Sequence, residues 1–165
     1  MSEDAVLLQR PEGFRRVTQV LREAGHPHAP VFLEVPARTA QEAADALGIQ
    51  LGQIAKSIVF RRKDDDRPVL VITSGDKRVD EKKVSALVGA LGRADAEYVK
   101  ARTGFAIGGV SPVGHLEPPV LLIDRELFRF DEVWAAAGHP NGVFRVTPQD
   151  LARLTGAPVE DVTAA

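Results

Sequence analysis

The sequence predicts a single mixed α/β domain. Its 165 residues are 44% hydrophobic and 27% charged, which is typical of one globular domain with a substantial core. Patterns typical of helices and strands follow each other in the order helix, strand, helix, strand pair, helices, strands and helix. This order lacks the strict alternation that builds a doubly wound sheet, so we expect a mixed sheet surrounded by helices.

The N-terminal part predicts two helices and one strand. Residues 1–12 show no strong pattern, and we expect a flexible lead-in there. Apolar residues at three- and four-residue spacing predict a helix over 13–24, and residues 31–35 have the composition of a strand. The capping box that begins at Thr39 predicts a helix over 40–47.

The middle of the chain predicts a hairpin followed by two helices. A short helical turn over 51–55 leads into two strands, 57–62 and 68–73. Three consecutive aspartates lie between these strands, and we interpret them as a solvated hairpin tip rather than a metal cluster. Helices are expected over 81–91 and 94–102.

The C-terminal part is richer in strands. Residues 119–124 predict a buried strand, 127–130 a turn or short strand, 132–137 a further strand and 143–146 another. A threonine–proline start then predicts a last helix over 147–156.

Composition excludes several classes of protein. The chain has no cysteine, which excludes disulfides and thiolate metal sites and favours a reducing cytoplasm. We expect no signal peptide and no membrane partner, because no apolar run approaches the ~20 residues of a membrane span. The net charge is −2, but residues 56–102 hold twelve Lys and Arg against eight Asp and Glu. This local excess fits a focused phosphate contact, and equally an ordinary solvated surface.

Lys56 lies inside an apolar run, where a predicted helical turn changes to a strand. Ile54 and Ala55 precede it, and an Ile-Val-Phe stretch follows Ser57. A lysine in such a run either extends to solvent from a strand edge or lines a cleft. If it lines a cleft, it is a fixed cation suited to a phosphate or carboxylate.

A loop rich in glycine and proline follows at residues 105–115. Within it, Gly108 to Pro112 reads Gly-x-x-x-Pro. The glycines allow backbone to approach a ligand closely, and the proline stiffens one side of the loop. Such loops also occur as ordinary connections between elements.

Lys56, the Gly108–Pro112 loop and a later Gly-His turn at 137–140, taken in this order, resemble the YbaK/EbsC family. These proteins are free-standing aminoacyl-tRNA deacylases similar to the editing domain of bacterial prolyl-tRNA synthetase. The resemblance covers roughly residues 31–156 and implies a curved, partly barrel-like mixed sheet. It also implies hydrolysis of the ester that joins a wrong amino acid to the 3′ end of a tRNA, with tRNA-Pro the expected substrate.

The resemblance implies the following site residues. Expected catalytic residues are Lys56, as a fixed charge, with Gly108 and Gly109, whose backbone amides would stabilise the oxyanion. Expected substrate-binding residues are Ser57, Val110, Ser111, Pro112, Gly138 and His139. Ser57 has the alternative of a strand serine without a ligand, and His139 that of an ordinary turn residue. Trp134, the single tryptophan, is assigned to the core.

The family's chemistry needs neither a metal nor a cofactor, and we expect none. The four histidines are scattered, and no pair has the i,i+4 spacing of a helical metal site. The motifs of serine hydrolases, zinc proteases and P-loop enzymes are absent. Expected partners are the acceptor end of misacylated tRNA and prolyl-tRNA synthetase.

Two other functions stay open. The chain can be a non-catalytic module that binds a tRNA end or an amino acid beside a synthetase. A DNA-binding protein is disfavoured by the low overall charge and by the lack of a helix-turn-helix with a basic second helix. The amino acid that is removed is not fixed, with alanine, cysteine, serine, threonine and 2-aminobutyrate all implied by the family.

Overall fold

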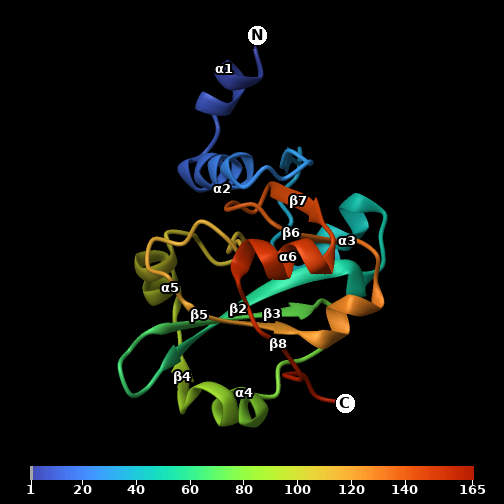
Figure 1. Ribbon diagram of the computed structural model, residues 1–165. Coiled ribbons are helices and arrows are strands. Elements are labelled where there is room, and N and C mark those ends of the chain that lie inside the picture. The colour runs from blue at the N-terminus through green and yellow to red at the C-terminus, as the bar shows by residue number, and fades with distance from the viewer. Residues whose placement is uncertain (1) are drawn as a thin grey trace.

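The computed structural model describes residues 2–165 and confirms a mixed α/β domain. Eight strands form one sheet in the order β1-β7-β6-β2-β3-β5-β8, and β4 pairs with β2 beside this path (Figure 1). Their bounds are β1 Val31–Phe32, β2 Ile54–Arg62, β3 Pro68–Ser74, β4 Leu91–Arg93, β5 Val120–Asp124, β6 Val133–Ala136, β7 Gly142–Val146 and β8 Val159–Glu160. The pairs β2–β6, β3–β5 and β5–β8 are parallel, and the other pairs are antiparallel.

Helices cover both faces of this sheet. Their bounds are α1 Glu3–Leu8, α2 Glu12–Glu23, α3 Ala40–Leu47, α4 Glu81–Val88, α5 Ala96–Thr103 and α6 Pro148–Thr155. On one face, α2, α5 and α6 contribute Phe14, Val99 and Leu151 to the largest apolar cluster. On the opposite face, α4 packs Val84 against Val71 of β3 (Figure 1). None of the helices within residues 2–165 is long and apolar enough to cross a membrane.

Several boundaries differ from the sequence prediction. Residues 3–8 form α1, which was not expected, with the Ser2 hydroxyl accepting a capping bond from the Ala5 amide at 3.1 Å. The predicted strand over 31–35 shortens to two residues. The helix predicted over 81–91 ends at Val88, because Gly89 adopts a φ of 104°.

Other short elements were missed or assigned wrongly. Of the three residues of β4, Leu91 was predicted as the end of a helix and the other two were assigned to no element, but all three pair with the end of β2. Of the segment predicted as a turn or short strand at 127–130, residues 127–129 lie within a 3₁₀ helix over Arg125–Arg129. The two-residue strand β8 pairs with β5 and was not predicted. Elements this short carry too few residues to show a periodic pattern.

Strand β2 is partly uncovered along one edge. On the edge away from β3, β6 pairs with Ile54 and Ala55, and β4 pairs with residues 60–62. Between these two pairings, no strand of the described chain pairs with residues 56–59 on that edge. The sheet therefore has an opening between β6 and β4, and we call the uncovered residues Lys56–Val59 the open edge.

The register shows which backbone groups point into this opening. The Gly75 amide donates to the Ile54 carbonyl at 2.7 Å, and the Arg62 amide donates to the Arg67 carbonyl at 2.9 Å. Even-numbered residues of β2 therefore direct their backbone groups towards β3. Because these groups alternate along a strand, Ser57 directs its amide and its carbonyl into the opening.

A tight contact between two turns sets the start of β2. The Ser74 hydroxyl donates to the Gly52 carbonyl, and Arg129 binds the Ser74 hydroxyl at 2.9 Å and Asp76 at 2.9 Å. A Cβ atom added at Gly75 would overlap the carbonyl oxygen of Leu51. The backbone of the 3₁₀ turn Leu51–Gln53 therefore lies directly against the turn after β3.

Gly75→Ala is expected to destabilise the fold by roughly 1–3 kcal/mol, since its methyl group meets backbone that cannot rotate away. Gly92→Ala is the matched control, because its Cβ would come no closer than 3.6 Å to another atom. Denaturant unfolding of both variants measures the difference. Equal stability of the two variants would contradict this contact.

Candidate functional site

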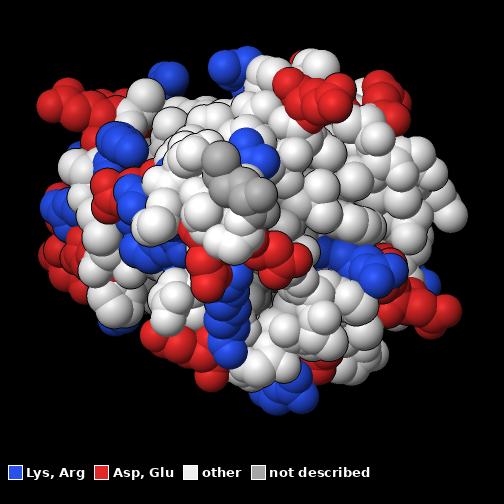
Figure 2. All heavy atoms as spheres, turned by 90° about the horizontal axis from the view of Figure 1, so that it is seen from above, with Lys and Arg blue, Asp and Glu red and all other residues white. Residues whose placement is uncertain are grey.

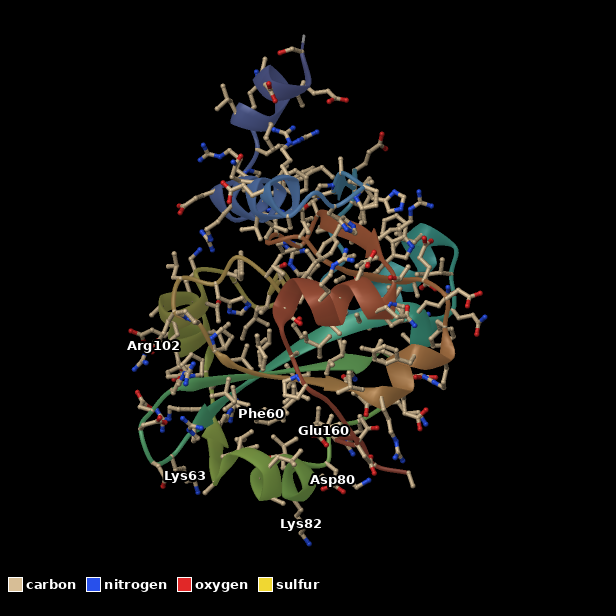
Figure 3. The ribbon with its side chains drawn as sticks, viewed as in Figure 1. Phe60, Lys63, Asp80, Lys82, Arg102 and Glu160 are labelled. Carbon is tan, nitrogen blue, oxygen red and sulfur yellow. The ribbon has the colours of Figure 1, made fainter. Side chains whose placement is uncertain are left out.

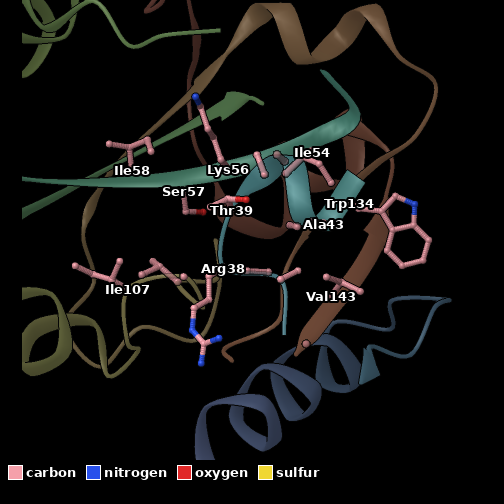
Figure 4. A pocket seen from close by; sticks show the side chains of 18 of the residues that line it. Arg38, Thr39, Ala43, Ile54, Lys56, Ser57, Ile58, Ile107, Trp134 and Val143 are labelled. Atoms are coloured by element: carbon pink, nitrogen blue, oxygen red, sulfur yellow. The ribbon is translucent and has the colours of Figure 1, made fainter. Parts of the chain in front are cut away.

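A cavity of about 320 Å³ lies at the open edge of β2. It is lined from β2, β6 and β7, from the segment that starts α3, and from the Gly108 loop (Figure 4). The apolar lining residues include Ala43, Ile54, Val59, Ile107, Val110, Trp134 and Val143. This size is within the range of sites for small ligands.

Few polar side chains line the cavity, and those that are charged carry a positive charge. They belong to Arg38, Thr39, Lys56 and Ser57, and no aspartate, glutamate or histidine of the described chain lines the cavity. The cavity therefore suits an apolar group attached to an anionic one. A side-chain general base is not among its lining residues.

Lys56 lines this cavity, as the sequence predicted, but its side chain leaves β2 on the side away from the Gly108 loop. Figure 4 shows Lys56 and Ser57 extending in opposite directions, with Ile107 on the Ser57 side. The backbone of Lys56 pairs with Thr73 of β3, but its side chain forms no hydrogen bond or ion pair within residues 2–165. Burial lowers the pKa of Lys56 below its usual value and nearby Arg78 acts in the same direction, while Asp76 partly opposes them. It is a cation without a fixed partner.

Ser57 faces the interior of the cavity. Its Oγ is buried and has no hydrogen-bond partner among the described residues. Together with the backbone groups that face the opening, this hydroxyl makes Ser57 a polar point among the apolar residues of the wall. The contact of Ser57 with a substrate stays a prediction, beside the alternative of a strand serine without a ligand.

Arg38 is a second cation at the cavity that sequence reasoning missed. It is exposed, and it forms no hydrogen bond or ion pair with the described chain. The Arg38 backbone also packs over Gly108, where an added Cβ would lie 3.4 Å from its Cα atom. The Pro-Ala-Arg sequence has no motif that would have marked this residue, because its role follows from tertiary packing.

The Gly108 loop begins with a β-turn. The Gly109 amide donates to the Ala106 carbonyl at 3.0 Å, and Gly108 takes a φ of 92° at the third turn position, which favours glycine. Gly108 lines the cavity and its amide is free within the described residues. The expectation of a free Gly109 amide is corrected, because that amide closes the turn.

Gly109 has a packing role instead. A Cβ atom at this position would lie 2.8 Å from the backbone of His139. The loop therefore rests directly against the turn between β6 and β7. This close approach of two backbones, rather than approach to a substrate, explains the glycine.

The rest of the Gly-x-x-x-Pro loop divides between the cavity and the core. Val110 lines the cavity, whereas Ser111 and Pro112 are buried and do not. The Ser111 hydroxyl accepts from the Val113 amide at 3.2 Å, and the Ser111 carbonyl accepts from His115 Nε2 at 2.5 Å. Burial lowers the pKa of His115, which favours the neutral ring that holds this loop.

Gly138 and His139 support the site from outside the cavity. His139 Nδ1 accepts from the Asn141 amide at 3.1 Å, and its ring stacks on Phe32 with centroids 5.4 Å apart. Burial, with a smaller effect of Arg38, lowers the pKa of His139. Neither residue lines the cavity, so the structure favours the turn alternative for His139.

Trp134 was assigned to the core but lies at the cavity wall. It is partly buried, and it packs with the apolar cluster under α3. No group of three or more His, Asp or Glu side chains within residues 2–165 is arranged to hold a metal ion. Figure 2 shows positive and negative side chains interspersed over the face seen from above, without a field of a single sign.

Comparisons with known proteins agree with this geometry. The model of the aminoacyl-tRNA editing domain matches residues 34–154. The YwhH protein of Bacillus subtilis is 34% identical over 123 residues, which are 74% of this chain and 78% of that protein. The proline–tRNA ligase of Limosilactobacillus fermentum is 35% identical over 96 residues, but these are 55% of this chain and only 17% of the ligase.

Solved structures give the same fold. A crystal structure of a candidate trans-editing enzyme for prolyl tRNA synthetase superposes with a TM-score of 0.87 at 43% identity, covering 94% of this chain and 99% of that one. The family match spans the cavity residues from Arg38 to Val143. The chain belongs to the aminoacyl-tRNA editing domain family.

Proposed function

We propose that this protein is an aminoacyl-tRNA deacylase that hydrolyses misacylated tRNA in trans, with tRNA-Pro carrying a small non-cognate amino acid as its substrate. The observation that carries the proposal is the apolar cavity with unpaired cations at its wall. Such a cavity matches an amino acid esterified to a polyanionic RNA end. The name of the solved relative, a candidate trans-editing enzyme for prolyl tRNA synthetase, supports the choice of tRNA and of that synthetase as a partner.

Lys56 and Arg38 are proposed to hold the phosphates of the acceptor end. Both are unpaired in the described chain, and they come from two different elements at the cavity. A cation without an internal partner gives up no ion pair when it binds a phosphate. Two such contacts orient the RNA end without a broad basic surface, in agreement with a net charge of −2.

Hydrolysis of this ester bond requires little catalysis by protein side chains. An aminoacyl ester is activated, and positioning of a water molecule plus stabilisation of the oxyanion supplies much of the acceleration. The free Gly108 amide is a proposed oxyanion donor. Hydroxyl groups of the substrate's own ribose are proposed to assist the attacking water, because no carboxylate or imidazole in the described part of the chain lines the cavity.

The same lack of a general base favours one second candidate. A cavity with cations and no base also suits a non-catalytic module that binds a charged tRNA end beside a synthetase. Turnover distinguishes the two functions. Release of amino acid from alanyl-tRNA-Pro by catalytic amounts of protein is expected, and binding without release would favour the module.

Lys56→Ala is expected to lower kcat/KM for this release by about 10- to 100-fold. Loss of a charge-assisted contact costs roughly 1.5–3 kcal/mol, and each 1.36 kcal/mol is tenfold in rate. Lys82→Ala is the matched control, since Lys82 is exposed on α4 and extends away from the domain (Figure 3). If a folded Lys56→Ala protein kept wild-type kinetics, Lys56 would have no part in substrate binding or catalysis.

The cavity wall is expected to select amino acids by size. Ile107→Ala enlarges the cavity, so hydrolysis of 2-aminobutyryl-tRNA should rise relative to alanyl-tRNA by up to about tenfold. Leu116→Ala serves as control. Its side chain is as exposed as that of Ile107, at 60% against 59%, but it does not line the cavity. If the ratio of the two hydrolysis rates were unchanged in Ile107→Ala, Ile107 would not belong to the wall that selects the amino acid.

A further inference from the structure

Ser57 presents three unsatisfied polar groups at one point of the cavity. Its amide and carbonyl face the opening between β6 and β4, where no strand pairs with it. Its buried Oγ also lacks a partner within residues 2–165. Backbone groups that no strand pairs with are free to bind water or a ligand, and the buried, unpartnered Ser57 hydroxyl beside them favours a ligand that binds at this point.

An aminoacyl ester has the complementary groups. Its α-amino nitrogen donates hydrogen bonds and its ester carbonyl accepts them, with one Cα atom between, as in a residue of a peptide chain. In an antiparallel ladder, two directly opposed residues exchange both backbone bonds. One amino acid can therefore pair with Ser57 through two hydrogen bonds.

The opening is short and is closed at both ends. The open edge spans four residues, 56–59, or roughly 13 Å at strand spacing. Strands β6 and β4 close it at its two ends. No carboxylate among residues 2–165 lines the cavity, so the amino group would meet neutral acceptors there, such as the Ser57 carbonyl and hydroxyl.

We propose that the aminoacyl group of the substrate adds to the sheet as a one-residue strand, with its amino group donating to the Ser57 carbonyl and its ester carbonyl accepting from the Ser57 amide. This proposal rests on the deacylase function proposed above. It is a form of strand addition, in which main-chain bonds give affinity and neighbouring pockets give side-chain selectivity.

The pairing also fixes where the substrate side chain goes. Side chains of directly opposed residues lie on the same face of a sheet, so the amino acid side chain follows Ser57 towards Val110 and Ile107. The ester carbonyl keeps a second lone pair for the Gly108 amide. Strand pairing thus places the reacting carbonyl near the Gly108 loop without a catalytic side chain.

The α-amino group should therefore be required for catalysis. Alanyl-, lactyl- and propionyl-tRNA differ only in carrying an amino group, a hydroxyl group or hydrogen at Cα. The enzymatic rate divided by the spontaneous hydrolysis rate is expected to fall in that order, with propionyl-tRNA at least tenfold below alanyl-tRNA. Equal acceleration of all three esters would overturn the pairing and leave the deacylase function intact. If the protein did not accelerate the hydrolysis of alanyl-tRNA, the proposed deacylase function itself would be wrong.

Hydrogen exchange tests the pairing without turnover. The probe is adenosine that carries alanine in a stable 3′-amide linkage. When it binds, the Ser57 amide should exchange at least tenfold more slowly, while the Ile58 amide, which faces β3, stays slow in both states. The Thr73→Val variant, which removes another buried unpartnered hydroxyl outside the cavity lining, should show the same protection. Binding of the probe with unchanged Ser57 exchange would falsify the pairing.

Discussion

The site depends on a strand edge that is left without a partner. Residues 56–59 of β2 lie between the pairings to β6 and β4, so the backbone groups of Ser57 face a cavity instead of another strand. An exposed strand edge invites association with other chains, and proteins usually cover it. Here the edge lies inside a cavity bounded by α3, the Gly108 loop and Trp134, which limits access to something small.

Side chains alternate between the two faces of β2, and this separates the proposed phosphate contact from the proposed amino acid pocket. Lys56 and Ser57 are neighbours in the chain but leave the strand in opposite directions (Figure 4). The charge on Lys56 is therefore held apart from the wall that is proposed to contact the amino acid. This arrangement allows a phosphate contact and an apolar selective pocket to lie next to each other without a buried cation in the pocket.

The supports of the site are mostly backbone contacts. The turn after β3 touches the turn before β2 at Gly75, and the Gly108 loop touches the β6–β7 turn at Gly109. His115 and Ser111 hold the far end of the same loop. Small residues and buried hydrogen bonds thus fix the loop, while the residues that face the ligand stay free of internal partners.

Much of this was readable from the sequence, and the limits have physical reasons. The long strands β2 and β3 and the capped helices carry strong local patterns, so the α/β class was predicted correctly. Lys56 was expected where a helical turn changes to a strand, whereas it lies inside β2, which begins at Ile54. Trp134 was missed as a cavity residue because its place arises from the pairing of β6 with β2, and Arg38 because it packs against the Gly108 loop, which lies far from it in the sequence. Gly109 and His139 have the expected residue types for a site, but their contacts are with each other.

A crystal structure of the complex with the 3′-alanylamide of adenosine 5′-phosphate tests the central claim most directly. The account predicts the alanyl group in the opening between β6 and β4 beside Ser57, with its methyl group towards Val110 and the phosphate bound by Lys56 or Arg38. A second cavity of about 290 Å³ lies between α1, α2 and the segment before β1. Density for the compound there, with the open edge of β2 empty, would contradict the account.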